Sequence, residues 1–217
     1  MRRKLAVGAI VLLALFGWTA AYVQRGKVPA EAIQSSVIRT QALLDRAWAL
    51  PVAATFRHGI AWQSNPSVCG AASLANVFRS FAEAADTEAG VLAGTSHCWF
   101  GICIIGLTLD QLAELARAHT KRKVSVLRDL TPETFRELLH EANNPDRRYI
   151  INFSRASIFG AGVGHHSPIG GYLEREDLVF VLDINRDFQP WLVERSRLFS
   201  AMDTLDGDKK RGLLLIE

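Results

Sequence analysis

The stretch that decides the fold is residues 63–74, QSNPSVCGAASL, which runs from a polar loop into the start of a helix. From Leu74 onward, large apolar residues recur at i, i+3, i+4 and i+7, which predicts a helix with one buried face. Cys69 stands where that helix begins. A helix N-terminus stabilises negative charge and so lowers the pKa of a thiol, and the thiolate is the nucleophilic form. Cys69 is therefore a candidate nucleophile, although a single cysteine is more often a buried structural residue.

Gln63 adds a second element of the same chemistry. An attacked carbonyl develops an oxyanion, which needs hydrogen-bond donors held in place around it. The side-chain amide of Gln63, six residues before the nucleophile (69 − 63), can pair with the backbone N–H of Cys69 for this purpose. A lone glutamine in a loop is ordinarily only solvated, so the indication comes from the two residues together.

The base and its carboxylate are predicted in a late β-hairpin. Two apolar runs, residues 168–173 and 178–183, flank the polar turn 174–177. His165 and Asp183 then lie near the same open end of the hairpin. A carboxylate there can accept the imidazole N–H, fix its tautomer and stabilise the imidazolium. A Cys–His–Asp triad is therefore predicted.

A second histidine competes for the role of base. Neighbouring residues on a strand face opposite ways, so we expect only one of His165 and His166 to meet Cys69. Periodicity leaves open which one. Gly164, directly before the pair, allows the backbone to approach a ligand closely.

The remaining pattern predicts an α+β domain, with helices packed on an antiparallel sheet that forms later in the chain. Thr108 and Gln111 form a capping-box pattern that starts a helix ending near His119. The further elements expected are one helix over residues 29–50, a strand over 123–127, a helix from 131–132, and strands over 149–153, 191–193 and 212–216.

The N-terminus has the pattern of a targeting segment. Basic residues at positions 2–4 precede an apolar run over 5–23, which is just long enough to span a bilayer as a hydrophobic anchor helix. We expect an uncleaved anchor in the inner membrane with the catalytic domain outside the cytoplasm. Cleavage near the small residues 19–21, with secretion to the periplasm, is the alternative. The chain is accordingly divided into a signal peptide or membrane anchor (1–27), a linker helix (28–55) and a catalytic domain (56–217).

Three cysteines leave at least one thiol without a partner in the chain. In an oxidising compartment Cys98 and Cys103 could form a disulfide, which would leave Cys69 reduced. With His97 they could also suggest a metal site, but a structural zinc site usually has four ligands and no fourth is evident nearby. We expect no resident metal ion.

Composition excludes two classes of protein. The chain is 49% hydrophobic and 22% charged, which is typical of a packed domain and not of general disorder. The net charge of +3 comes from five basic residues ahead of the first acid, Glu31. Without them the chain has 20 basic residues (25 − 5) against 22 acidic ones. No basic face for nucleic acid is therefore expected.

Two segments, QSNPSVCGAASL (63–74) and GHHSPIGGY (164–172), resemble the phytochelatin synthase family, and the likeness covers roughly residue 56 to the C-terminus. The resemblance implies a papain-like fold and a glutathione γ-glutamylcysteinyltransferase activity. It matches Cys69 to the family's nucleophile and Gln63 to its oxyanion glutamine. It also selects His165 over His166, because the family has an aromatic residue after the histidine, and it places the acid at Asp183.

Near the C-terminus, Asp206 and Arg211 are similar to the acidic and basic pair with which the family binds the γ-glutamyl group, although their spacing here is shorter. The resemblance implies glutathione as substrate and no tightly bound cofactor. Cadmium or zinc would then enter as the metal–thiolate form of the acceptor glutathione. The cysteine-rich C-terminal region of plant members does not follow residue 217, which favours hydrolysis and puts metal-tuned regulation in doubt.

Two other functions fit parts of the pattern. A membrane-anchored papain-like peptidase would share the glutamine and cysteine but not the Ser-Pro-Ile-Gly-Gly run over residues 167–171. A non-catalytic binder of metal or thiol peptides would keep the scaffold without needing Cys69. The oligomeric state has no signal in the sequence.

Overall fold

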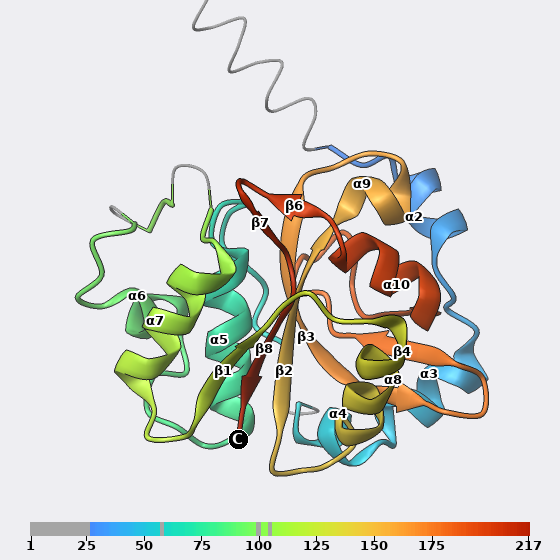
Figure 1. Cartoon of the computed structure of the whole chain (residues 1–217), viewed down its shortest axis with the longest axis horizontal. Coiled ribbons are helices and arrows are strands. Elements are labelled where there is room, and N and C mark those ends of the chain that lie inside the picture. The colour runs from blue at the N-terminus through green and yellow to red at the C-terminus, as the bar shows by residue number, and fades with distance from the viewer. Residues whose placement is uncertain (1–26, 57–58, 99–100, 104–105) are drawn as a thin grey trace, which may run out of the picture.

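The computed structural model describes residues 27–56, 59–98, 101–103 and 106–217. Its centre is a six-stranded antiparallel sheet in the order β1-β8-β2-β3-β4-β5, and a separate two-stranded ribbon, β6-β7, lies at one edge of the domain (Figure 1). The strands are β1 (Val124–Leu127), β2 (Arg148–Ser154), β3 (Gly164–Leu173), β4 (Leu178–Val181), β5 (Trp191–Glu194), β6 (Leu205–Asp206), β7 (Lys209–Lys210) and β8 (Leu213–Ile216).

Helices cover both faces of this sheet. Figure 1 shows α5, α6 and α7 together on one side and α8 and α10 on the other. The described helices are α2 (Ala30–Ser36), α3 (Gln41–Trp48), α4 (Pro51–Thr55), α5 (Cys69–Ser80), α6 (Glu88–Leu92), α7 (Leu109–His119), α8 (Pro132–Glu141), α9 (Arg155–Phe159) and α10 (Arg195–Met202). The predicted α+β class is therefore confirmed.

The sheet divides the core into two parts, because successive side chains of each strand face opposite ways. On β2, Ile150 packs with the helices α3, α4, α5 and α7, whereas Ile151 and Phe153 pack with α2, α8, α9 and α10. Since both faces are covered, the central strands are buried along almost their whole length, polar residues such as Asn152 and His166 included. The longest strand, β3, lies near the middle of the sheet and carries the two histidines of interest.

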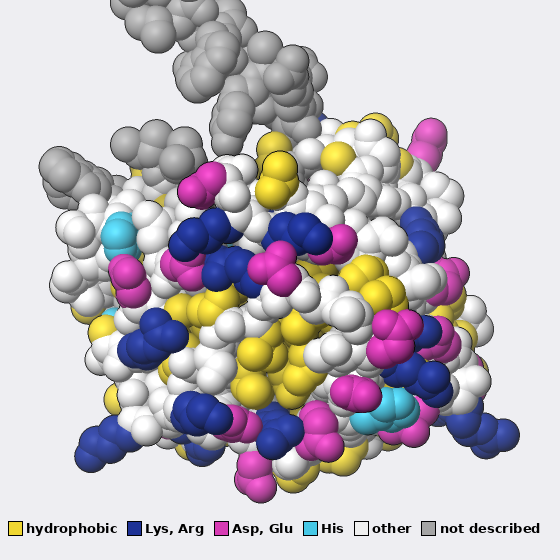
Figure 2. Space-filling view, viewed as in Figure 1, with side chains coloured by type: hydrophobic (Ala, Val, Ile, Leu, Met, Phe, Trp, Pro, Cys, Tyr) yellow, Lys and Arg dark blue, Asp and Glu magenta, His cyan; other side chains and the backbone are white. Residues whose placement is uncertain are grey.

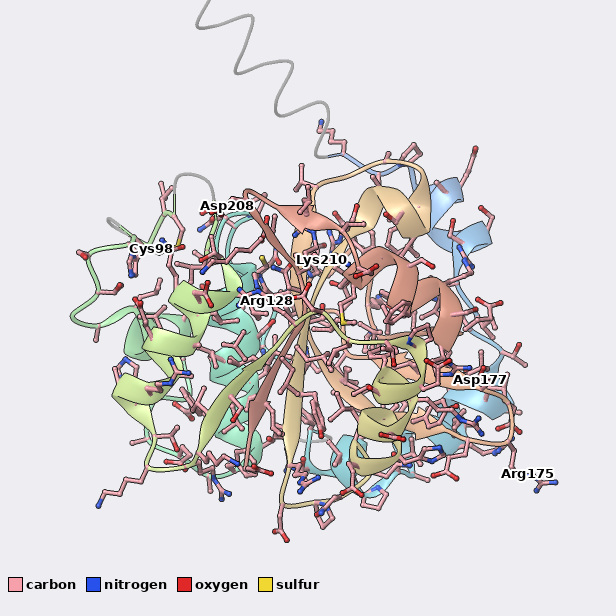
Figure 3. All side chains as sticks on the ribbon, viewed as in Figure 1. Cys98, Arg128, Arg175, Asp177, Asp208 and Lys210 are labelled. Carbon is pink, nitrogen blue, oxygen red and sulfur yellow. A yellow bond between two sulfur atoms is a disulfide. The ribbon has the colours of Figure 1, made fainter. Side chains whose placement is uncertain are left out.

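The predicted hairpin is present, with β3 and β4 paired over residues 171–173 and 178–180. A register shift follows at Gly171, whose φ of +144° and close neighbours leave no room for a side chain. Figure 3 labels Arg175 and Asp177 at the turn of the hairpin, far from Asp208 in the β6–β7 turn. The open end of the hairpin therefore points toward the edge of the domain that carries β6 and β7.

The single linker helix predicted within residues 28–55 is wrong. Three short helices, α2, α3 and α4, occupy this range. Ile38 interrupts them because its backbone forms a β-bridge with Leu192, with hydrogen bonds of 2.8 and 3.1 Å, and so covers the free edge of β5. Pro51 then starts α4 at its first position. The segment packs on the domain and is part of its core, as buried Ala47 and Val52 show.

The hydrophobic anchor helix predicted over residues 5–23 lies outside the described residues. Within the described part, no helix has the length and apolarity needed to cross a bilayer. The surface shown in Figure 2 mixes basic and acidic side chains. Over the β6–β7 ribbon, for example, Arg128 and Lys209 both pair with Asp110, and Lys210 pairs with Asp203.

Candidate active site

Cys69 is the first residue of α5, as predicted, and every residue from Cys69 to Phe78 is buried. The helix is surrounded by protein because it packs between the sheet and α7. Small residues at positions 70–72 let the start of the helix pack tightly in this layer. A β-carbon added at Gly70, for example, would lie only 3.1 Å from Leu112 Cδ1. The Cys69 side chain is 6% exposed and its sulfur is free.

The open end of the hairpin brings His165 and Asp183 together. His165 is the second residue of β3, and Asp183 follows the end of β4. The imidazole Nε2 lies 3.0 Å from Asp183 Oδ1, and both side chains are buried. The ring of His165 also packs edge-on against Phe153, with centroids 5.7 Å apart. Because Nε2 faces Asp183, Nδ1 is the ring nitrogen that remains available to the sulfur.

Both histidines interact with Cys69, so the expectation that only one could do so is wrong. The sulfur lies 3.8 Å from His166 Nδ1. It also interacts with His165, because each of the two groups shifts the pKa of the other. Neighbouring side chains do leave opposite faces of a strand. However, His165 and His166 stand at the very start of β3, so rings from both faces can turn toward a sulfur at the end of the sheet.

The electrostatics of the site favour a thiolate–imidazolium pair. Burial raises the pKa of the Cys69 thiol, but hydrogen bonds to both histidines, together with the charge of His165, outweigh it and hold that pKa well below its ordinary value. Burial and the Arg155 cation lower the pKa of His165, yet Asp183 and the Cys69 sulfur raise it further, so it lies above its ordinary value. Opposite shifts of this kind are how a buried cysteine becomes a nucleophile near neutral pH.

Arg155 holds the carboxylate of Asp183 from behind. Its Nη2 donates to both carboxylate oxygens, at 2.8 and 2.9 Å, and its guanidinium lies 3.5 Å from the ring centroid of Phe188. Asp183 also accepts from the backbone N–H of Asn185 at 3.0 Å and from Trp191 Nε1 at 3.3 Å. Burial raises the pKa of Asp183, but these cations and donors hold it well below its usual range.

Gln63 is tied to the segment that carries the acid. Its backbone N–H donates to the carbonyl of Ile184 at 2.9 Å, one residue after Asp183. Its side chain and Cys69 line the same pocket, and its Oε1 is buried without a hydrogen-bond partner among the described residues. The glutamine predicted to contribute an oxyanion donor therefore lines the same pocket as the sulfur.

The pocket over Cys69 has a volume of about 720 Å³. Its walls include Gly164, Asp206 and Arg211 together with Gln63, Cys69 and His165. Of the predicted site residues, Asp183 alone does not line the cavity, because it is fully buried and bonded to His165. Gly164 is required there because a β-carbon at this position would lie 2.3 Å from Arg211 Nη1. The guanidinium therefore packs directly on the backbone next to His165.

Asn152, which no motif in the sequence singles out, joins the acidic and basic members of this wall. Its side-chain amide donates to Asp206 Oδ2 at 2.8 Å and accepts from Arg211 Nη1 at 2.7 Å. Arg211 Nη2 also lies 3.2 Å from Asp206 Oδ1. Asn152 is fully buried in β2, so it fixes both charged groups to the sheet.

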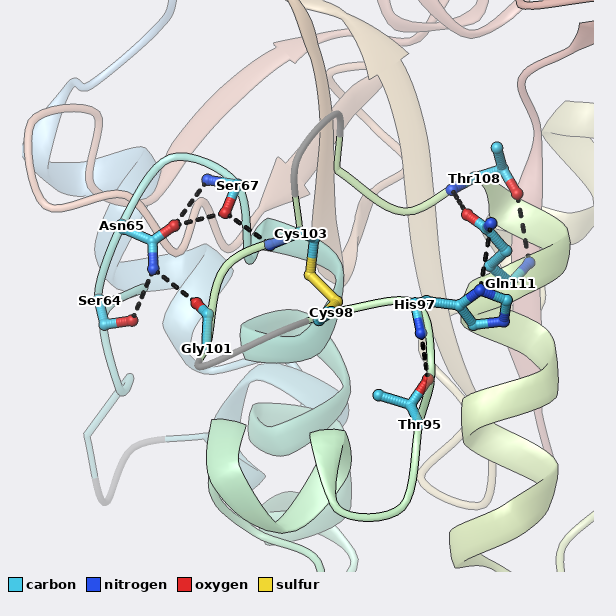
Figure 4. Close-up of a disulfide and its surroundings, with 10 residues drawn as sticks. All are labelled: Ser64, Asn65, Ser67, Thr95, His97, Cys98, Gly101, Cys103, Thr108 and Gln111. Atoms are coloured by element: carbon cyan, nitrogen blue, oxygen red, sulfur yellow. Dashed lines mark hydrogen bonds between the residues drawn. A yellow bond between two sulfur atoms is a disulfide. The ribbon is translucent and has the colours of Figure 1, made fainter.

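A disulfide joins Cys98 and Cys103 and braces the loop before the nucleophile (Figure 4). The backbone N–H of Cys103 donates to Ser67 Oγ at 3.1 Å, and Asn65 donates to the carbonyl of Gly101 at 3.0 Å. His97 faces Gln111 and Glu114 instead of a metal cluster. Among the described residues no group of three or more His, Cys, Asp or Glu is placed to hold a metal ion.

Comparison with known proteins places this arrangement in a family. The family model for phytochelatin synthase matches residues 23–213. Glutathione gamma-glutamylcysteinyltransferase 3 of Lotus japonicus is 31% identical over 173 residues, which are 71% of this chain and 35% of the relative. Glutathione gamma-glutamylcysteinyltransferase 2 of Arabidopsis thaliana is 28% identical over 172 residues, covering 71% and 37%. The chain thus spans about a third of the length of these relatives.

The fold is also found among solved structures. A crystal structure described as a C39-like peptidase from Bacillus anthracis covers 75% of this chain and 95% of its own, with a TM-score of 0.56 and 13% sequence identity. At that identity the likeness concerns the fold alone, which is the papain-like one.

Proposed function

Because this chain belongs to the phytochelatin synthase family, we propose that it transfers the γ-glutamylcysteinyl group of glutathione through a thioester on Cys69. The observation that carries the proposal is the Cys69–His165–Asp183 arrangement, which opens into a pocket with a fixed Asp206 and Arg211. A nucleophile and a site for a charged amino-acid end are both needed for this substrate.

In the first half-reaction, the Cys69 thiolate attacks the carbonyl that joins cysteine to glycine in glutathione. A carbon–sulfur bond forms, and the oxyanion is held by the backbone N–H of Cys69 and the side-chain amide of Gln63. The His165 imidazolium gives its proton to the glycine nitrogen as the carbon–nitrogen bond breaks. Asp183 keeps the ring in place and stabilises its charged form.

In the second half-reaction, His165 removes a proton from the acceptor, which attacks the thioester and releases Cys69 as thiolate. Water as acceptor gives γ-glutamylcysteine, and the amine of a second glutathione gives a phytochelatin. A cadmium or zinc ion would take part as the metal–thiolate form of that second glutathione, as cargo and not as a resident cofactor.

The γ-glutamyl end of the substrate fits the wall built on Asn152. Arg211 can pair with its α-carboxylate and Asp206 with its α-ammonium group, since these are the charges that a free amino-acid end presents. The Arg211 side chain is only 10% exposed, so a carboxylate that reaches it meets a partly desolvated cation. Specificity for a γ-linked peptide would follow from the distance between this pair and Cys69.

We also propose that residues 5–23 attach the chain to the inner membrane, with the catalytic domain on the outer side or released to the periplasm. The basic flank and apolar run in the sequence support this. Membrane fractionation and protease protection of the full chain test it. A full-length protein found entirely in the cytosol would contradict it.

Mass spectrometry after brief exposure to glutathione tests the reaction. We expect a γ-glutamylcysteinyl adduct on Cys69 that survives a phosphine reductant, which removes mixed disulfides, and is cleaved by hydroxylamine. The variant Cys69→Ser should lose the adduct and glycine release together. The double variant Cys98→Ser/Cys103→Ser is the matched control and should keep both. Unmodified wild-type protein with no glycine released, or preferential cleavage of ordinary peptides, would count against the proposal.

A further inference from the structure

His166 is a buried imidazole that the mechanism above does not use. It is 3% exposed, and its Nδ1 lies 3.8 Å from Cys69 Sγ. Its backbone carbonyl accepts a hydrogen bond from Ser73 Oγ at 3.0 Å, and Ser73 lies one helical turn after Cys69 in α5. The ring is therefore held on the same helix that holds the nucleophile.

The other ring nitrogen shows which tautomer the site favours. His166 Nε2 is buried and has no hydrogen-bond partner among the described residues. An imidazolium would bury a charged N–H there without an acceptor, which is more costly than a bare nitrogen. The neutral ring with its proton on Nδ1 therefore fits best. In that form His166 donates a hydrogen bond to the sulfur without carrying charge.

The groups that act on the sulfur then have distinct roles. His165, backed by Asp183 and Arg155, can carry a positive charge and exchange a proton with substrate. Arg211, which packs against Gly164, interacts with Cys69 through its charge. His166 alone adds a neutral donor. A donor of this kind stabilises the sulfur most when it is fully negative, which is before attack and again when the thioester breaks.

We propose that His166 is a positioning residue that speeds breakdown of the Cys69 thioester by stabilising the departing sulfur. The inference rests on the proposed function. In this step the acceptor oxygen or nitrogen bonds to the acyl carbon, the carbon–sulfur bond breaks, and its electron pair stays on Sγ. The acceptor's proton passes to His165, while His166 keeps its Nδ1 proton. A thiolate that is better stabilised leaves faster, and it loses only part of its nucleophilicity in return.

Two variants of the whole chain test this. His166→Phe removes the donor but keeps a planar ring, and His166→Asn keeps an N–H near the position of Nδ1 without a titratable group. The first readout is the rate of Cys69 alkylation by iodoacetamide against pH, which needs no substrate. We expect the midpoint for His166→Phe to rise by about 1–2 pH units, as the loss of a hydrogen bond to a charged group predicts. His166→Asn should stay near wild type.

The second readout is the lifetime of the γ-glutamylcysteinyl thioester after excess glutathione is removed. We expect about a tenfold longer lifetime in His166→Phe and a lifetime near wild type in His166→Asn, given the same dependence on thiol acidity. Circular dichroism confirms that each variant is folded. An unchanged midpoint and lifetime in the Phe variant, or an Asn variant that behaves like Phe, would overturn the proposal. If no thioester forms in any protein, the proposed function fails, and the alkylation curves still decide whether His166 acts on the sulfur.

Discussion

Replacing Arg155 by methionine removes the only described cation bonded to Asp183 apart from His165, and it leaves a fully buried carboxylate without its guanidinium partner. Methionine keeps most of the aliphatic stem, which lies beside Gly162, and loses the guanidinium together with its contact to the Phe188 ring. The perturbation is thus mainly electrostatic. Breaking a buried ion pair by removing one partner costs about 3–5 kcal/mol of unfolding free energy.

The size of the loss can be expressed as a melting temperature. For a domain of this length, 1 kcal/mol corresponds to about 2–4 °C, so Arg155→Met should melt roughly 6–20 °C below wild type. The deficit should also depend on pH. The depressed pKa of Asp183 contributes stability that is present above its unfolded value, about 3.9, and is lost as pH falls. The difference between variant and wild type should therefore be greatest near neutral pH and shrink below about pH 4.

Thermal and urea unfolding followed by circular dichroism measure this loss. Arg46→Met is the matched control, because it breaks an equally bidentate but exposed pair with Glu176 and should change the midpoint far less. In the double variant Arg155→Met/Asp183→Asn the buried charge is removed as well, and part of the stability should return. The proposed role of the Arg155–Asp183 ion pair would be refuted if Arg155→Met were as stable as wild type. It would also be refuted if the stability lost in the double variant equalled the sum of the losses in the two single variants.

Two further predictions concern activity. The pH dependence of kcat/KM should be bell-shaped, rising through a pKa of Cys69 below its ordinary value and falling through a pKa of His165 above its own. Asp183→Asn should move the falling limb to lower pH, and a limb that stays in place would contradict the pairing. Gly164→Ala should raise KM for glutathione by about tenfold or more, because its β-carbon displaces Arg211 from the charge-assisted bond proposed with the substrate's α-carboxylate. An unchanged KM would mean that Arg211 does not bind substrate.

The elements that sequence predicts well are those with a strong local signal. The buried stripe of α5, the capping box at Thr108 and Gln111 and the β3–β4 hairpin all depend on residues within a few positions of each other. The open end of the hairpin then places a histidine, His165 or His166, near Asp183. The choice of His165 and its pairing with Cys69 came from the family resemblance and not from local pattern.

What sequence could not predict depends on contacts between distant segments. Asn152 lies within β2, and Arg155 follows directly after this strand. Their roles appear only once the later segments that carry Asp183, Asp206 and Arg211 fold against them. Likewise, the helix expected over residues 29–50 is broken because its middle pairs with β5, far along the chain. The one local signal that could have directed attention to them is a polar residue inside an apolar strand, Asn152, or directly after it, Arg155.

The start of the described chain also limits how far the protein can be shortened. Lys27 and Val28 line the pocket, and a Val28 methyl lies 2.9 Å from where Gly162 would carry a β-carbon. A version that begins at Ala30 would retain all helices and strands of the described part, yet it would open one side of the cavity. Soluble forms prepared for kinetics or crystallisation should therefore retain residue 27, and an affinity tag fused directly ahead of it would adjoin a residue that lines the pocket.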